Sequence, residues 1–222
     1  MQQITSLQNP LVKYLFTLTQ KSKQRKEQQQ FLIEGKREIS LALEAGYLIE
    51  QLFICPDILS ETEVEKLFSG YKCTAISTQV YEKLTYRSST EGILALAQCK
   101  NHALSGVEFQ KAHPLVLVAE APEKPGNIGA LLRTADAAGI DAVYIANPKT
   151  DMYNPNVIRS SVGTLFTVPI ATASTEELLH FLAQEHFTLY CAALSASVPY
   201  DSVSYKGRTA IAVGTEDVGL SP

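Results

Sequence analysis

Short apolar runs alternate with amphipathic segments along most of the chain. In the second half, residues 115–120 begin with five consecutive apolar residues, a pattern typical of a strand buried on both faces of a parallel sheet. Strands that alternate with helices predict an α/β fold with a doubly wound parallel sheet, in which ligands bind outside the carboxyl ends of the strands. The same patterning predicts further strands over 142–146, 165–168, 187–193 and 209–213, and helices from residue 127, over 156–161 and over 175–185.

The first half alternates in the same way on a smaller scale. Asn9-Pro10 is a helix start, and the leucines that follow recur at helical spacing. The polar residues 20–30 predict a mobile or strongly solvated connection. The whole pattern predicts a small α/β sandwich with a partly parallel sheet. Its strands are expected over 31–33, 48–55 and 73–77, and its further helices before Gly46, over 61–68 and over 78–84.

The segment after the strand at 115–120 contains the most informative residues. Pro125 and Gly126 break the apolar pattern, Asn127 is a good N-cap, and apolar residues then recur at helical spacing until a glycine ends the helix. Backbone N–H groups and the positive end of the helix therefore point toward the crevice above the sheet. Arg133 lies close enough to this end for its long side chain to reach the same crevice.

The length of 222 residues is enough for two modest domains. Residues 101–113 are less apolar and contain Gly106, so we expect the domain junction there. The expected organisation is a small α/β domain over residues 1–105 and a parallel-sheet domain over residues 112–222.

Composition narrows the class of protein. Hydrophobic residues make up 45% of the chain, the mean hydropathy is +0.01, and no apolar run approaches the roughly 20 residues of a membrane span. The first residues lack the basic start and apolar stretch of a signal peptide, so we expect a cytoplasmic protein with no membrane partner. The 4 cysteines lie far apart and the 4 histidines form no ligand pattern, so we expect reduced thiols and no metal.

Charge is distributed unevenly along the chain. The net charge is −4, but residues 1–40 contain 7 lysines and arginines against 3 glutamates. A basic amino-terminal segment on an acidic body favours directed contact with phosphates. A solvated charged turn between helices is the alternative interpretation.

Several short segments resemble motifs of a known family. The run from Asn127 through Gly129, Arg133, Thr134 and Ala135 to Gly139, residues 157–166 (VIRSSVGTLF) and residues 211–221 (IAVGTEDVGLS) resemble the SpoU (TrmH-like) branch of the SPOUT RNA methyltransferases. Residues 6–10 (SLQNP), 24–26 (QRK), 31–35 (FLIEG) and 91–95 (EGILA) resemble the ribosomal-protein-like substrate-binding domain that precedes the SpoU catalytic domain. The resemblance implies a carboxyl-terminal parallel-sheet domain of the SPOUT trefoil-knot type.

The resemblance also implies an activity: transfer of a methyl group from S-adenosylmethionine to a ribose 2′-hydroxyl of structured RNA, with rRNA as the expected substrate, by a homodimer. Arg133 matches the family arginine that activates the hydroxyl, as general base or as its electrostatic partner. A guanidinium is almost always protonated, which favours stabilisation of the developing alkoxide. Asn127 and Glu216 are implied at the reaction centre, and the cofactor would be held by Val213, Gly214, Thr215, Glu216 and Gly219.

Three loops at strand ends are expected to converge on this site: residues 127–133, 154–163 and 214–219. Arg159, with the two serines that follow it, fits either a phosphate contact or a dimer contact. The expected RNA contacts are Lys13, Arg25, Lys26, Lys36, Arg37, Arg87 and Arg159.

The residues alone leave alternatives open. An arginine such as Arg133 is commonly solvated or paired with a carboxylate such as Asp136. Residues 214–221 nearly spell a phosphate-binding P-loop, but Leu220 stands where the lysine must be. A dinucleotide-dependent oxidoreductase needs Gly-x-Gly-x-x-Gly after the strand, and only Gly-x-x-Gly is present.

A third motif normally follows the second in this family, and the sequence stops at Ser221-Pro222. We therefore expect the chain as given to hold half a donor site and an incomplete knot. A truncated chain, a shortened gene product and an inactive relative all fit this pattern. The alternative function is an RNA-binding protein without catalysis.

Overall fold

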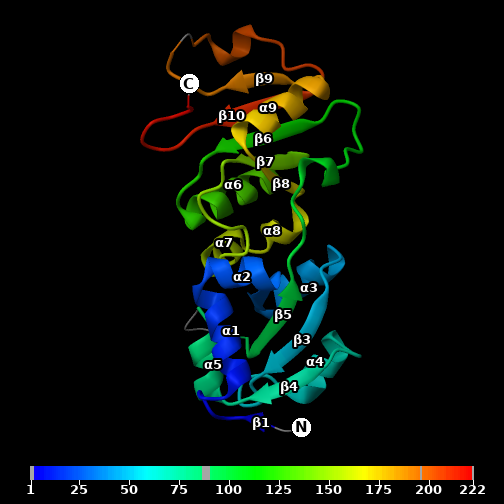
Figure 1. The fold of residues 1–222 in the computed structure, drawn as a ribbon. Helices are drawn as coiled ribbons and strands as arrows, with labels where there is room; N and C mark the ends of the chain where they lie inside the picture. Colours follow the sequence, from blue (N-terminus) through cyan, green and yellow to red (C-terminus); the bar gives the residue numbers. More distant parts are fainter. Residues whose placement is uncertain (1–2, 87–90, 196, 222) are drawn as a thin grey trace. The chain divides into compact units, whose positions relative to one another are not determined.

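The computed structural model describes residues 3–86, 91–195 and 197–221. Contacts divide the chain into two compact units. The first comprises Met1–Lys100 with Tyr153–Ile158, and the second comprises Asn101–Met152 with Arg159–Pro222. Each unit contains one five-stranded sheet (Figure 1).

The sheet of the first unit has the strand order β1-β4-β3-β5-β2. Strands β1, β4 and β3 are parallel, whereas β5 is antiparallel to both β3 and β2, so the prediction of a partly parallel sheet is confirmed. The strands are β1 (Gln3–Ile4), β2 (Gln30–Glu34), β3 (Ile49–Ile54), β4 (Cys73–Ile76) and β5 (Ile93–Gln98), and the helices are α1 (Pro10–Gln20), α2 (Ser22–Gln28), α3 (Lys36–Glu44), α4 (Glu61–Leu67) and α5 (Thr78–Leu84).

Helices α1 and α5 contribute to one hydrophobic cluster on this sheet. The side chain of Asn9 caps α1 by accepting a hydrogen bond from the amide of Leu11 at 2.8 Å, as the sequence predicts. The apolar face of α1 then buries Leu15 and Leu18 against sheet residues such as Phe53. Burial of this amphipathic face holds the helix in place.

The polar run at 20–30 contains helix α2, which the sequence pattern does not predict; most of its side chains are exposed, as predicted for a solvated connection, but Arg25 is buried. Arg25 in this helix is only 3% exposed, and its Nη1 donates to the main-chain oxygen of Leu18 at 2.6 Å. Leu18 lies in the last turn of α1, where free carbonyl groups favour a cation. The buried arginine therefore ties α2 to the end of α1.

The sheet of the second unit has the strand order β8-β7-β6-β10-β9, and all of its neighbouring strands are parallel. This confirms the predicted parallel sheet. Its strands are β6 (Leu115–Glu120), β7 (Ala142–Ala146), β8 (Ile170–Ala173), β9 (Thr188–Cys191) and β10 (Thr209–Val213). Its helices are α6 (Pro125–Ala138), α7 (Pro155–Ser161), whose first residues belong to the first unit, α8 (Thr164–Thr167) and α9 (Thr175–Gln184).

Side chains cover both faces of this parallel sheet. Val116 and Val118 of β6 belong to a cluster with the buried face of α9, and the alternate residues Leu117 and Ala119 are buried as well. Such double burial explains why β6 is an unbroken apolar run. Residue Val213 of β10 lies opposite Ala119, so the two strands end side by side.

Two local predictions in this unit are wrong. Helix α6 begins at Pro125, so Asn127 lies in its first turn and is not the N-cap. A proline suits this first position because its fixed φ is helical and its missing N–H has no partner there. Residues 165–167 lie in helix α8 and Val168 is its C-cap, so the strand predicted over 165–168 is wrong. Pro169 comes next, and β8 begins at Ile170.

Candidate functional site

A cavity of about 700 Å³ lies at the carboxyl ends of β6 and β10, beside the first turns of α6. Helix α6 contributes Asn127, Leu131 and Thr134, and the loop after β10 contributes residues 213–218. These two segments are therefore brought together as the sequence predicts. None of the residues 154–163, the third predicted loop, lines this cavity.

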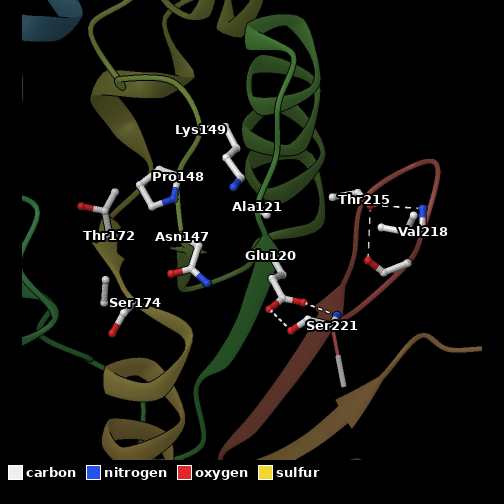
Figure 2. Close-up of a pocket in the computed structure, with 12 residues that line it drawn as sticks. Glu120, Ala121, Asn147, Pro148, Lys149, Thr172, Ser174, Thr215, Val218 and Ser221 are labelled. Atoms are coloured by element: carbon white, nitrogen blue, oxygen red, sulfur yellow. Dashed lines mark hydrogen bonds between the residues drawn. The ribbon is translucent and has the colours of Figure 1, made fainter. Parts of the chain in front are cut away.

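A second cavity of about 660 Å³ opens beside the first, at the ends of β6, β7 and β8 (Figure 2). Asn147 follows β7 with a left-handed φ of 47°, and its Nδ2 donates to Thr175 Oγ1 at 2.7 Å. The two cavities meet, because both are lined by Glu120, Ala121, Lys149, Thr215 and Val218.

The loop after β10 is a tight hairpin. The amide of Thr215 donates to the oxygen of Gly219 at 2.9 Å, and the amide of Gly219 donates back to the oxygen of Thr215 at 3.1 Å. A Cβ at Gly214 would overlap the main chain of Gly219 and Leu220, so only glycine fits. Of the predicted cofactor residues, Val213, Gly214, Thr215 and Glu216 line the first cavity and Gly219 lines the second.

An ion pair joins the two segments that form the first cavity. The Nζ of Lys124, the N-cap residue of α6, lies 3.2 Å from Glu216 Oε2. The hydrogen bond that Lys124 donates to the Glu216 carboxylate raises the pKa of the Lys124 side chain. Both side chains are about 70% exposed, so the pair contributes little to stability. It does place the Glu216 carboxylate on the same cavity as Asn127.

Arg133 does not line this cavity. On helix α6 it lies about a third of a turn away from the face that carries Asn127 and Leu131, and its Nη1 donates to the main-chain oxygen of Ser160. The helix approaches Ser160 so closely on that side that a Cβ at Gly129 would overlap Ser160. The expectation that Arg133 faces the 213–219 loop is therefore not met within a single chain.

The predicted RNA contacts occupy different environments. Arg25 is buried, which does not fit a contact with RNA. Lys36 is paired with Glu63 at 2.9 Å. Arg87 lies outside the described residues. The side chains that remain exposed are Lys13, Lys26, Arg37 and Arg159.

Two residues of the site were missed in the sequence. Glu120 is the last residue of β6, and Lys149 follows β7 by three positions; both line the two cavities. Their sequence signal is a charged residue at, or directly after, the carboxyl end of an apolar strand, the edge at which parallel sheets bind ligands.

Within residues 3–86, 91–195 and 197–221, no cluster of histidine, cysteine or acidic side chains is arranged to hold a metal ion. No helix in this described part is both long and apolar enough to cross a membrane.

Sequence comparison assigns both halves of the chain. Residues 114–222 match the SpoU rRNA methylase family, and residues 9–95 match the MRM3-like substrate-binding domain. A solved structure described as an RNA 2′-O ribose methyltransferase is 38% identical, covers 99% of this chain and 84% of its own, and superposes with a TM-score of 0.82. The chain belongs to the SpoU rRNA methylase family.

Two further relatives match almost the whole chain. The 23S rRNA (guanosine(2553)-2′-O)-methyltransferase RlmP of Bacillus subtilis is 28% identical over 220 residues, which cover 99% of this chain and 85% of that protein. An AdoMet-bound rRNA methyltransferase of Sinorhizobium meliloti is 26% identical, with a TM-score of 0.88 over 99% of this chain and 83% of its own. The parallel-sheet unit is thus a SPOUT methyltransferase fold.

Proposed function

We propose that the protein methylates the 2′-hydroxyl of a ribose in rRNA, with S-adenosylmethionine as methyl donor. The observation that carries this proposal is the meeting of Asn127 and Glu216 on one cavity at the carboxyl edge of a SpoU parallel sheet. The relatives named above are methyltransferases of RNA, and one of them is described as AdoMet-bound.

The first cavity fits the proposed donor in size and charge. Its volume lies within the range of roughly 300–1,000 Å³ found for small-molecule sites. When bound, S-adenosylmethionine supplies a methyl group on a positively charged sulfur. Carboxylates outnumber ammonium groups on the wall, which suits a cationic ligand. The charged residues of the wall are Glu120, Glu123, Glu216 and Asp217 against Lys124 and Lys149.

In this proposal the residues of the chain orient the donor and the ribose and stabilise the charge that develops on the 2′-oxygen. Main-chain groups of Val213, Gly214 and Thr215 hold the donor. They line the cavity because Gly214 has no side chain, which lets the two sides of the hairpin stay together. Asn127 and Glu216 orient the ribose. The guanidinium of Arg133 stabilises negative charge developing on the 2′-oxygen, whose proton leaves to a phosphate or to water. Alignment of donor and oxygen is then the main source of rate.

The proposal includes a homodimer in which Arg133 of one protomer completes the cavity of its partner. The support is the position of Arg133 on the Ser160 side of α6 and not on the cavity of its own chain. Arg159, which is exposed next to Ser160, is assigned a contact with either RNA or the partner protomer.

RNA binding is assigned to exposed cations. On the first unit these are Lys13, Lys26 and Arg37; the match of this region to a substrate-binding domain supports the assignment. Near the cavities, the exposed Lys149 offers a cation to a phosphate on a wall that is otherwise rich in carboxylates.

Arg25 and Lys26 are adjacent cations with different expected roles. Arg25→Ala should lower the free energy of unfolding by about 2 kcal/mol, because a buried charged hydrogen bond to Leu18 is lost. Lys26→Ala should leave stability unchanged and weaken RNA binding. The slope of log K for RNA binding against log salt concentration should become shallower by about 1. Denaturant titration and fluorescence anisotropy at several salt concentrations measure the two effects. An unchanged salt slope for Lys26→Ala would place the RNA surface elsewhere.

The proposed function is tested with methyl-labelled S-adenosylmethionine and purified rRNA. We expect calorimetry to show donor binding, and nuclease digestion followed by mass spectrometry to show label in a 2′-O-methylated nucleoside. Label in a base would overturn the assignment of the acceptor. RNA binding without any donor binding would support the alternative of a non-catalytic RNA-binding protein.

A further inference from the structure

Glu120 is a buried carboxylate between the two cavities. It is 7% exposed and is the last residue of β6. Its Oε1 accepts hydrogen bonds from Thr175 Oγ1 at 2.9 Å and from Ser221 Oγ at 2.6 Å, and its Oε2 accepts from the amide of Ser221 at 2.7 Å. Figure 2 shows both contacts with Ser221.

These donors come from two separate parts of the unit. Thr175 is the first residue of α9, whereas Ser221 follows the hairpin that holds Glu216. The start of that loop is held by pairing of Val213 with Ala119, the neighbour of Glu120 on β6. Two consecutive residues of one buried strand therefore hold both ends of the loop.

The carboxylate is the form of Glu120 that these contacts favour. The hydrogen bond from the Ser221 hydroxyl lowers the pKa of Glu120, the Ser221 amide and the Thr175 hydroxyl lower it further, and burial opposes them. A buried charge is expensive unless hydrogen bonds satisfy it, so the carboxylate and the position of Ser221 depend on each other.

We propose that Glu120 is a positioning residue that holds the 214–221 loop in place through Ser221 and thereby sets the affinity for the methyl donor. This inference rests on the proposed function, because that function makes the loop the donor site. Glu120 acts through the loop and not on the reacting atoms.

The test uses the full chain and the variants Glu120→Gln, Glu120→Asp and Ser221→Ala. For Glu120→Gln we expect the KM for S-adenosylmethionine to rise about tenfold, with kcat at saturating donor within about twofold of the parent. Ser221→Ala should raise the same KM by a smaller factor, and the double variant should show less than the product of the two effects. Glu120→Asp should have a KM close to that of Glu120→Gln, because its shorter side chain keeps the charge but does not reach Ser221.

A second readout does not depend on catalysis. Hydrogen exchange of the amides in residues 214–221 should accelerate in Glu120→Gln, with and without donor. Asp141→Asn is the matched control: Asp141 lies just before β7, away from the strand ends that form the cavities, and its Oδ2 accepts from the amide of Leu115, the first residue of β6, at 2.8 Å. This variant should lose some stability without a change in KM or in exchange of the loop.

The outcomes separate this inference from the proposed function. In one outcome the parent protein binds donor and methylates RNA, while hydrogen exchange of the loop is the same in Glu120→Gln as in the parent. That result would overturn the positioning role alone. Full recovery by Glu120→Asp, or a normal KM in Ser221→Ala, would also overturn it, because charge near the donor would then explain the effect. If loop exchange is faster in Glu120→Gln but the parent protein binds no donor, the proposed function and the donor-affinity part of the inference are both overturned.

Discussion

Arg133→Ala is expected to lower kcat for RNA methylation by about 10²–10³-fold, the cost of removing one group that stabilises a developing oxyanion. The side chain is exposed, and its hydrogen bond to the Ser160 oxygen contributes on the order of 1 kcal/mol to folding. Donor affinity should be unchanged, because the proposed role of Arg133 is to stabilise charge on the 2′-oxygen of the RNA and not to hold the donor. Single-turnover kinetics with saturating donor and RNA measure this effect directly.

Mixing two inactive variants tests whether Arg133 serves the partner protomer. Arg133→Ala and Glu216→Ala each damage one half of a composite site. If the halves come from different protomers, random re-association should restore about a quarter of parental activity, because half of the dimers are mixed and each has one intact site of two. A mixture that stays inactive would place Arg133 and Glu216 in the same site of one chain.

Retention of most turnover by Arg133→Ala would remove the role of this guanidinium altogether. Arg133→Lys is the conservative comparison, since it keeps the positive charge but loses the planar fork. Partial recovery in Arg133→Lys would support electrostatic stabilisation.

Gly214→Ala is expected to abolish donor binding, with a loss of at least about 100-fold in kcat/KM. The added Cβ would overlap the main chain of Gly219 and Leu220, and the backbone on both sides of the hairpin has no flexible end that could move aside. The pair of hydrogen bonds between Thr215 and Gly219 would have to open. The fold should survive, because the hairpin lies beyond the carboxyl end of β10 and outside the sheet; we expect a loss of about 1–3 kcal/mol in the free energy of unfolding.

Gly126→Ala is the matched control for this variant. A Cβ at Gly126 meets no atom within 4 Å, and the residue lies inside helix α6, where alanine is favoured over glycine. In donor titration, Gly126→Ala should therefore behave as the parent does, whereas Gly214→Ala should bind no donor. In thermal unfolding, Gly126→Ala should be slightly more stable than the parent and Gly214→Ala less stable. Normal donor binding by Gly214→Ala would show that the 214–219 hairpin is not the donor site.

Most helices and strands follow from local sequence. The apolar run of β6 and the Asn9 cap of α1 each act within a few residues, and the strand and the helix that they predict are present. Two exceptions are also local. Pro125 starts α6 two residues early, and the strand predicted over 165–168 is instead β8, which begins after Pro169. Motifs on the ends of β6 and β10 also predict the shared cavity, because parallel neighbours bring their carboxyl ends together.

Tertiary structure alone decided where the charged side chains go. Helical spacing places Arg133 on α6 but does not say whether it meets the 213–219 loop or Ser160; the close approach at Gly129 decides that. Arg25 stands in a polar run and is buried because the end of α1 supplies its acceptor. Glu120 and Ser221 lie 101 residues apart and meet only because β6 and β10 are neighbours in the sheet. The physical reason is that periodicity and caps act within a few residues, whereas the partner of a buried charge comes from whatever segment the fold packs against it.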